Sequence, residues 1–251
     1  MTKDENIIVV DHVTMRFNLA EEKTSSLKEY IVKLFKGQLH FKEFFALKDV
    51  NFTVRRGEAV ALIGRNGSGK STMLKIIAGV LCPTKGSVKV NGTIAPLIEL
   101  GAGFDMELTA RENIFLNGAV LGYGRKFMTE HFNDIVDFAE LWDFIDVPIK
   151  NFSSGMVARL AFAIATTVTS DILVVDEVLA VGDFKFQEKC KDRMRQMMSK
   201  GTTLLFVSHS GDQVKQLCEK AVWLNHGVME EYGDVESVYR NYEIKMEQGL
   251  A

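Results

Sequence analysis

One segment constrains the fold of this chain more than any other. Residues 64–71 match the pattern G-x-x-x-x-G-K-[ST], with an aliphatic run (AVALI) before them and an apolar, helix-like stretch (TMLKIIAGVL) after them. A strand, a glycine-rich loop and a helix in this order typically bind phosphate, because backbone N–H groups and the positive helix end surround the anion. An ordinary glycine-rich turn is the alternative, and the strand–helix context argues against it.

The motif predicts a nucleotide site with Mg²⁺. Lys70 would reach the β- and γ-phosphates of ATP, and Ser71 would be a ligand of the metal. The predicted phosphate-binding residues are Gly64, Asn66, Gly67, Ser68, Gly69, Lys70, Ser71 and Thr72.

Aliphatic runs predict the rest of the fold. Short Val/Ile/Leu runs at 172–175 and 204–207 alternate with helix-like segments, which is typical of buried parallel strands in an α/β sheet covered on both faces. Further strands are expected at 7–17, at 46–63 with a turn at RRGE, and at 88–90. Helices are expected at 70–81, 109–145, 156–168 and in the tail. A chain of 251 residues with 47% hydrophobic residues can bury a full core.

Composition excludes several classes of protein. A net charge of −3 disfavours a nucleic-acid binder, and three widely spaced cysteines disfavour a disulfide framework or a zinc knuckle. The N-terminus does not resemble a secretory signal, and no window reaches 18 uncharged apolar residues, so we expect no membrane span.

An insertion of about 18–45 interrupts the first strands. Within it, residues 26–35 have one apolar helical face, and Ser26 with Glu29 forms a capping box. Residues 23–43 hold five lysines against two glutamates. The helix either packs on the domain or lies near a membrane or a membrane partner, and the sequence favours neither.

Two acids follow the aliphatic run at 172–175. Asp176 and Glu177 would stand at the carboxyl end of a parallel strand, where α/β sheets bind ligands. Asp176 suits Mg²⁺ or its water, and Glu177 suits a general base for the water that attacks the γ-phosphate. The alternative is that the two acids only open the next loop.

The order of the motifs resembles that of the ATP-binding subunits of ABC transporters. The phosphate loop is followed by Phe152-Ser153-Ser154-Gly155-Met156 before a helix, then by the two acids, then by Val207-Ser208-His209. Three longer segments resemble the branch that exports bacterial surface polysaccharides, O-antigen and teichoic acid: 97–114 (LIELGAGFDMELTARENI), 176–190 (DEVLAVGDFKFQEKC) and 204–227 (LLFVSHSGDQVKQLCEKAVWLNHG).

The resemblance implies an architecture and a dimer. It implies a single ABC domain over 1–251, with a RecA-like P-loop core, an antiparallel β-subdomain and a helical subdomain at about 100–165. It also implies a head-to-tail homodimer, in which the phosphate loop of one subunit and the signature residues of the other enclose each ATP. The signature residues would be Ser153, Ser154 and Gly155. Because the chain stops at Ala251, we expect no C-terminal glycan-binding domain.

The resemblance also implies roles for further single residues of this chain. Asp183 matches an aspartate that contacts the other subunit, and His209 matches a histidine that holds the γ-phosphate and orients Glu177. Phe17 falls where the family places a ring on the adenine, although a core position is equally compatible. Glu99 stands where the family usually has a glutamine that meets Mg²⁺ and the attacking water, which is a departure from the pattern.

The resemblance predicts an ATPase that drives export of a lipid-linked surface polysaccharide, O-antigen above all. Its partners would be a second copy, a separate transmembrane permease and the glycan, without nucleic acid, at the cytoplasmic face of the inner membrane. In the family, the subdomain that contains the stretch 112–115 contacts the permease. The apolar residues of this stretch could equally belong to the core. The alternatives are an ABC transporter of another substrate, a soluble ABC ATPase, and a kinase, which would not need the Ser153 motif.

Overall fold

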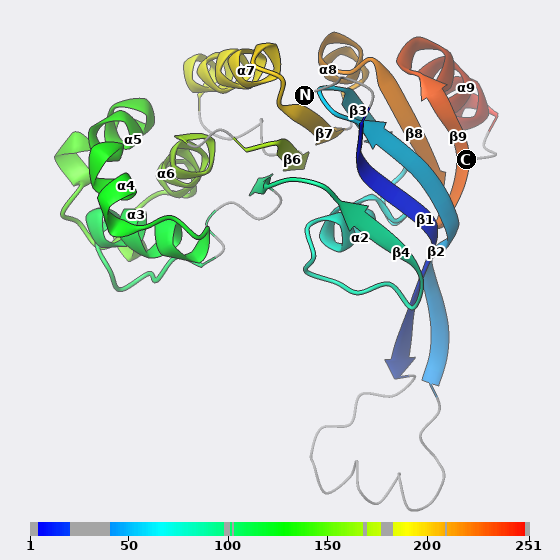
Figure 1. The fold of residues 1–251 in the computed structure, drawn as a ribbon, viewed down its shortest axis with the longest axis horizontal. Coiled ribbons are helices and arrows are strands. Elements are labelled where there is room, and N and C mark those ends of the chain that lie inside the picture. Colours follow the sequence, from blue (N-terminus) through cyan, green and yellow to red (C-terminus); the bar gives the residue numbers. More distant parts are fainter. Residues whose placement is uncertain are drawn as a thin grey trace, which may run out of the picture.

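A computed structural model describes residues 5–20, 41–97, 101, 103–167, 170–176, 183–208 and 210–248. The helix expected at 26–35 lies outside these residues. The described elements build a six-stranded sheet, a three-stranded sheet and two groups of helices (Figure 1).

The larger sheet has the order β5-β6-β7-β3-β8-β9. Its strands are β5 (Ile94–Leu97), β6 (Ile172–Asp176), β7 (Thr203–Val207), β3 (Ala59–Ile63), β8 (Lys220–Asn225) and β9 (Val228–Asp234). The first five are parallel, and β9 pairs antiparallel with β8. The carboxyl ends of β6, β7 and β3 are therefore neighbours at one edge.

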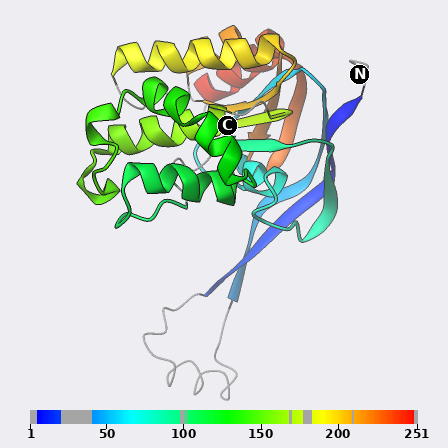
Figure 2. The same cartoon turned by 60° about the vertical axis from the view of Figure 1, so that its left-hand side comes forward.

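The smaller sheet is antiparallel, with the order β2-β1-β4. It consists of β1 (Asn6–Ala20), β2 (Phe41–Arg55) and β4 (Lys85–Val90). The outer ends of β1 and β2 continue as a two-stranded ribbon that extends away from the rest of the molecule (Figures 1 and 2). The insertion at 18–45 thus begins and ends at the far end of this ribbon.

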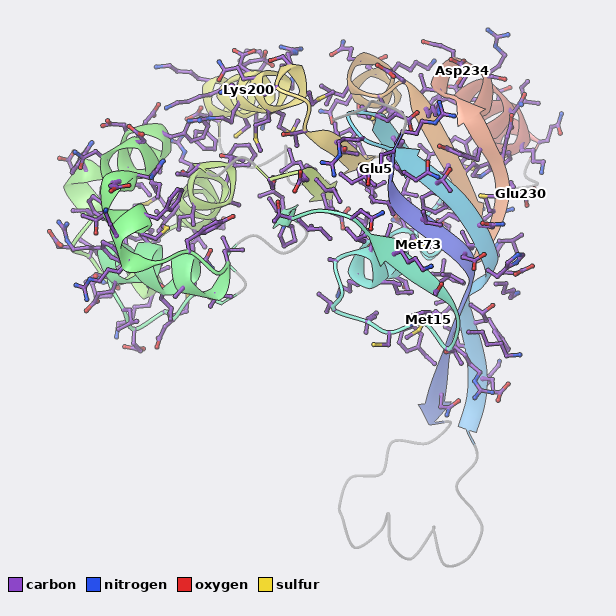
Figure 3. The ribbon with its side chains drawn as sticks, viewed as in Figure 1. Glu5, Met15, Met73, Lys200, Glu230 and Asp234 are labelled. Carbon is purple, nitrogen blue, oxygen red and sulfur yellow. The ribbon has the colours of Figure 1, made fainter. Side chains whose placement is uncertain are left out.

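Alternate side chains of the central strands enter two different cores. Val60 and Leu62 of β3 pack with β1, β2 and helix α2 (Lys70–Ile77), whereas Ala61 and Ile63 pack against the helices on the other face. Figure 3 shows Met73 on α2 beneath the smaller sheet, in the first of these cores. A sheet covered on both faces explains why its strands are continuous aliphatic runs.

The second face is covered by the remaining helices. They are α3 (Ala110–Val120), α4 (Arg125–Glu130), α5 (Phe132–Ala139), the 3-10 turns η1 (Trp142–Phe144) and η2 (Ile149–Asn151), α6 (Ser154–Thr167), α7 (Phe184–Ser199), α8 (Gly211–Leu217) and α9 (Val235–Glu247). Helices α3 to α6 form a group to one side of the sheet (Figure 1). The predicted fold class, a parallel core with an antiparallel β-subdomain and a helical subdomain, is confirmed.

Within the described part of the chain, no helix combines the length and the apolar character that crossing a bilayer requires.

Candidate functional site

A pocket of about 240 Å³ opens where three parallel strands end. The loop after β3, Asp176 at the end of β6 and Val207 at the end of β7 contribute to its wall. Its lining consists of Phe44, Ala46, Asn66, Gly67, Gly69, Lys70, Ser71, Thr72, Asp176 and Val207. The structure therefore brings together six of the eight predicted phosphate-loop residues and the first acid of the Asp-Glu pair.

Glycines let this loop lie close to its neighbours. Gly64 has φ 140°, and a Cβ there would stand 2.1 Å from the carbonyl oxygen of Leu224. Gly69 has φ 108°, and its Cβ would stand 2.6 Å from the carbonyl oxygen of Ala46. L-residues with side chains rarely adopt such conformations, so both positions require glycine. Ser68 is buried, and its carbonyl accepts a hydrogen bond from the N–H of Gly227.

Two features of the pocket attract anions. Helix α2 begins at Lys70, and its first-turn N–H groups have no acceptor within the helix, so they are free to bind an anion. Lys70 is only 5% exposed, and its Nζ donates to the carbonyls of Gly64 and Arg65 at 2.7 and 2.9 Å. Burial lowers the pKa of Lys70, while the charge of Asp176 acts in the opposite direction. The ammonium is thus held inside the loop that would surround a phosphate.

Two oxygen donors in the same lining suit a magnesium ion. Ser71 and Asp176 both line the pocket together with Lys70, and the charge of Asp176 acts on the Lys70 ammonium. Mg²⁺ prefers hard oxygen ligands and is usually held by one or two carboxylates, substrate phosphates and water. The donor set therefore fits Mg²⁺.

The aromatic side chain that the sequence placed near a base, Phe17, is partly buried and is not among the described residues that line the pocket. Phe17 pairs with Phe44 across β1 and β2, so both rings lie on the same face of the ribbon. Phe44 is 46% exposed and lines the pocket, whereas Phe17 packs against the core. Sequence reasoning missed Phe44, although only Phe45 separates it from the strand predicted at 46–63.

The Ser153 motif lies at the start of α6. The Oγ of Ser153 accepts from the N–H of Met156, which caps the helix. Ser153 and Ser154 are exposed, and a Cβ on Gly155 would meet only the Oγ of Ser153, at 3.8 Å, among the described residues. The described lining of the pocket includes no residue of α6. One chain therefore does not bring these residues to its own phosphate loop.

Asp183 connects α6 to α7 within the chain. Its carboxylate accepts from the N–H of Phe186 at 2.9 Å and from the guanidinium of Arg159 at 2.5 Å. These two interactions, the backbone bond first, hold the pKa of Asp183 below its usual value. Arg159 also pairs with Glu140 at 3.4 Å and lies over the ring of Phe186. The residue that the sequence assigns to subunit contact thus also orders its own helix end.

Three predicted residues, Glu99, Glu177 and His209, lie outside the described part of the chain. Their flanking elements are described. Asp176 and Val207, which precede Glu177 and the Ser208-His209 pair, both line the pocket.

Comparisons with known proteins agree with this geometry. The family model described as ABC transporter matches residues 47–180. An O-antigen export system ATP-binding protein, RfbB of Klebsiella pneumoniae, is 44% identical over 96% of this chain and 99% of its own length. The teichoic acids export ATP-binding protein TagH of Bacillus anthracis is 41% identical over 93% of this chain and 42% of its own length.

A solved structure supports the fold. The dimeric post-hydrolysis state of the ATP-binding cassette MJ0796, bound to ADP and Pi, superposes with a TM-score of 0.73 at 23% identity. The superposition covers 91% of this chain and 98% of that one.

Proposed function

Because this chain belongs to the ABC transporter family, whose ATP-binding subunits couple ATP hydrolysis to transport, we propose that it drives export of a lipid-linked surface polysaccharide, O-antigen above all. The observation that carries the proposal is the 44% identity to an O-antigen export protein over nearly the full length of both chains. The 41% identity to TagH supports teichoic acid as the alternative substrate within the same branch of exporters.

The geometry supports ATP hydrolysis by positioning and charge stabilisation. The backbone N–H groups of the phosphate loop and of α2 hold the phosphates, and Lys70 moves its donors from the loop carbonyls to the terminal phosphate oxygens. Glu177, directly after Asp176, accepts the proton of the attacking water. His209, two residues after Val207, holds the γ-phosphate and orients Glu177.

Ser71 and Asp176 would hold Mg²⁺, with Glu99 as a further ligand. When bound, the ion would neutralise part of the negative charge on the phosphates.

The exposed signature residues support a head-to-tail dimer. Ser153, Ser154 and Gly155 lie at the start of a helix that contributes no described residue to their own pocket, and both serines are exposed, so they are available to the γ-phosphate in a second copy. Asp183 stands at the start of the neighbouring helix α7 and would contact that copy. ATP binding closes such a dimer, and hydrolysis reopens it.

A groove on α3 is the proposed contact with the permease. It has a volume of about 350 Å³ and is lined by Glu112, Phe115, Ala119, Tyr123 and Arg125. Beside it, Val120 is 65% exposed. The lining combines apolar residues with one acid, Glu112, and one arginine, Arg125. This composition suits an amphipathic helix of the permease. This contact would place the chain at the cytoplasmic face of the inner membrane.

A Glu177→Gln replacement in the source organism tests the export role. We expect binding of ATP without turnover, lipid-linked glycan trapped inside the cell and a bare surface. Analysis of the trapped material would identify the glycan. A normal surface glycan, with the variant present and binding ATP, would overturn the export proposal and leave an ABC ATPase for another substrate.

A further inference from the structure

The C-terminal helix α9 is built onto the strands that hold the phosphate loop. In Figure 3, Glu230 marks β9, and Asp234 marks the point where β9 passes into α9. The turn between β8 and β9 touches the phosphate loop, because Gly227 N–H donates to the carbonyl of Ser68 at 3.0 Å. The charge of Arg65 in that loop also acts on the phenol of Tyr242 on α9. Helix α9 directly follows β9, so the β8–β9 pair connects this helix to the phosphate loop.

Tyr239 of α9 packs on the first residue of α8. A Cβ on Gly211 would stand 2.4 Å from the hydroxyl oxygen and 2.5 Å from Cζ of Tyr239. The ring thus fills the place of a side chain at Gly211. Lys215 of α8 lies 4.8 Å from the centre of the same ring, and its Nζ is 3.6 Å from the carboxylate of Glu236. Two contacts between the helices converge on this ring, and the Lys215–Glu236 ion pair adds a third contact between the same helices.

The anchored helix directly follows a wall of the nucleotide pocket. Val207 lines the pocket, and only residues 208–210 separate it from Gly211. Ser208 is described and largely buried, and its Oγ donates to Gln213 and accepts from the N–H of Ser210. Movement of the start of α8 would therefore move the end of this segment relative to the phosphates.

Helix α8 is too short to hold this position by itself. It has seven residues, and isolated helices of this length are not stable in water. Helix α9 is longer and well anchored: Val235 and Val238 are buried, and the ring of Tyr242 lies edge-on to Trp223 of β8. The rigid partner in this contact is α9.

We propose that Tyr239 is a positioning residue for ATP hydrolysis: its ring fixes Gly211 and so holds the start of α8, which directly follows the segment 208–210 after the pocket wall. This inference rests on the proposed role of that segment. Tyr239 is not among the described residues that line the nucleotide pocket, so it acts through its contact with the start of α8.

The first test compares two replacements of Tyr239 in the purified chain. Tyr239→Ala should lower kcat about tenfold, because small misplacements of catalytic groups are costly, while KM for ATP changes less than about twofold. Tyr239→Phe keeps the ring on Gly211 and should retain most of kcat. A matched control on the same helix is Asn241→Ala, which removes an exposed hydrogen bond to Glu231 and should leave both constants unchanged.

The second test asks whether the two residues act as one unit. Gly211→Ala needs the space that the ring occupies, so it should lower kcat as Tyr239→Ala does. The double variant should be no worse than the more affected single variant, because the two changes disturb the same contact. Independent effects that multiply would overturn the proposal, and so would an unchanged kcat in Tyr239→Ala. A fall in melting temperature with proportional loss of nucleotide binding would also overturn it.

A third variant separates this inference from the proposed site. Glu177→Gln should abolish turnover whatever Tyr239 does. If Glu177→Gln still hydrolyses ATP, the site proposal fails. If it is inactive while Tyr239→Ala retains the full kcat, only the positioning role fails.

Discussion

At the scale of single residues, the two facing rings of the ribbon allow a direct test of base binding. Phe44 is open to the pocket, and Phe17 lies against the core. Stacking on a base is worth about 1–3 kcal/mol. We therefore expect Phe44→Ala to raise the Kd for ATP by roughly 5- to 100-fold, and Phe17→Ala to lower the melting temperature with a smaller change in Kd.

Phe45→Ala is the matched control for Phe44→Ala. Phe45 neighbours Phe44 on the same strand and is also exposed, at 39%, but the next residue of a strand points to the opposite face. Equal loss of affinity in both variants would contradict stacking by Phe44. Loss of affinity only in Phe17→Ala would support Phe17, the residue assigned from sequence, as the ring that stacks on the base.

A second prediction at the scale of single residues concerns Glu99. At the position that the family resemblance assigns to Glu99, a carboxylate could still contact Mg²⁺, but it would add negative charge beside the γ-phosphate. We expect Glu99→Gln to leave ATP binding intact and to change the rate of hydrolysis, measured as phosphate release at saturating ATP. An unchanged rate, with unchanged coupling to transport, would mean that another residue fills this place.

These residues show how much of the site could be predicted from the sequence. Lys70, Ser71 and Asp176 were predictable because each belongs to a local pattern, a loop before a helix or a strand end. Phe44 was not, because its position depends on the register between β1 and β2, whose ends at Ala20 and Phe41 are separated by an insertion. Tyr239 and Gly211 carry no local pattern, and only tertiary packing brings them together.

At the scale of elements, a polar cluster joins the smaller sheet to the end of the larger one. The carboxylate of Asp171, just before β6, accepts from the N–H and hydroxyl of Thr93 at 2.8 and 2.9 Å and from Arg56 at 2.7 Å. The N–H of Thr93 contributes most to holding the pKa of Asp171 below its usual value, and Arg56 adds to it.

This cluster should make stability depend on pH. Because the folded-state pKa of Asp171 is depressed, its contribution is complete above the unfolded pKa of about 3.9 and is lost as pH falls through the lower folded value. We expect Asp171→Asn to lower the free energy of unfolding by about 1–3 kcal/mol at pH 7. Urea titrations of both proteins should then converge as pH falls below the folded-state pKa of Asp171. A difference that stays constant with pH would contradict an ionic contribution.

The elements themselves were predictable to different degrees. The runs at 172–175 and 204–207 gave strands because both faces of the central sheet are buried. Strand β5 contains Pro96, which argues against a strand, and it is tolerated because β5 lies at the edge of the sheet. The helical stretch at 109–145 divides into α3, α4, α5 and η1, since Gly122 at φ 87° ends the first helix.

At the scale of the whole molecule, the two groups of residues that the proposed dimer would bring together do not line one pocket in the described part of a single chain. The pocket holds the phosphate loop and Asp176, while Ser153 and Ser154 are exposed at the start of α6. In the head-to-tail dimer each nucleotide would bridge both groups, so ATP itself supplies part of the interface. A variant that binds ATP but does not hydrolyse it should accumulate as the dimer.

The Glu177→Gln variant should therefore be monomeric without nucleotide or with ADP, and dimeric with ATP, as measured by light scattering after gel filtration. Adding Ser153→Glu places a carboxylate against the γ-phosphate, so it should abolish the dimer while each monomer still binds a fluorescent ATP analogue. Ser199→Glu, at the exposed end of α7, is the matched control and should leave dimer formation unchanged. Persistence of the dimer in the Ser153→Glu variant would show that the signature of one copy does not complete the ATP site of the other.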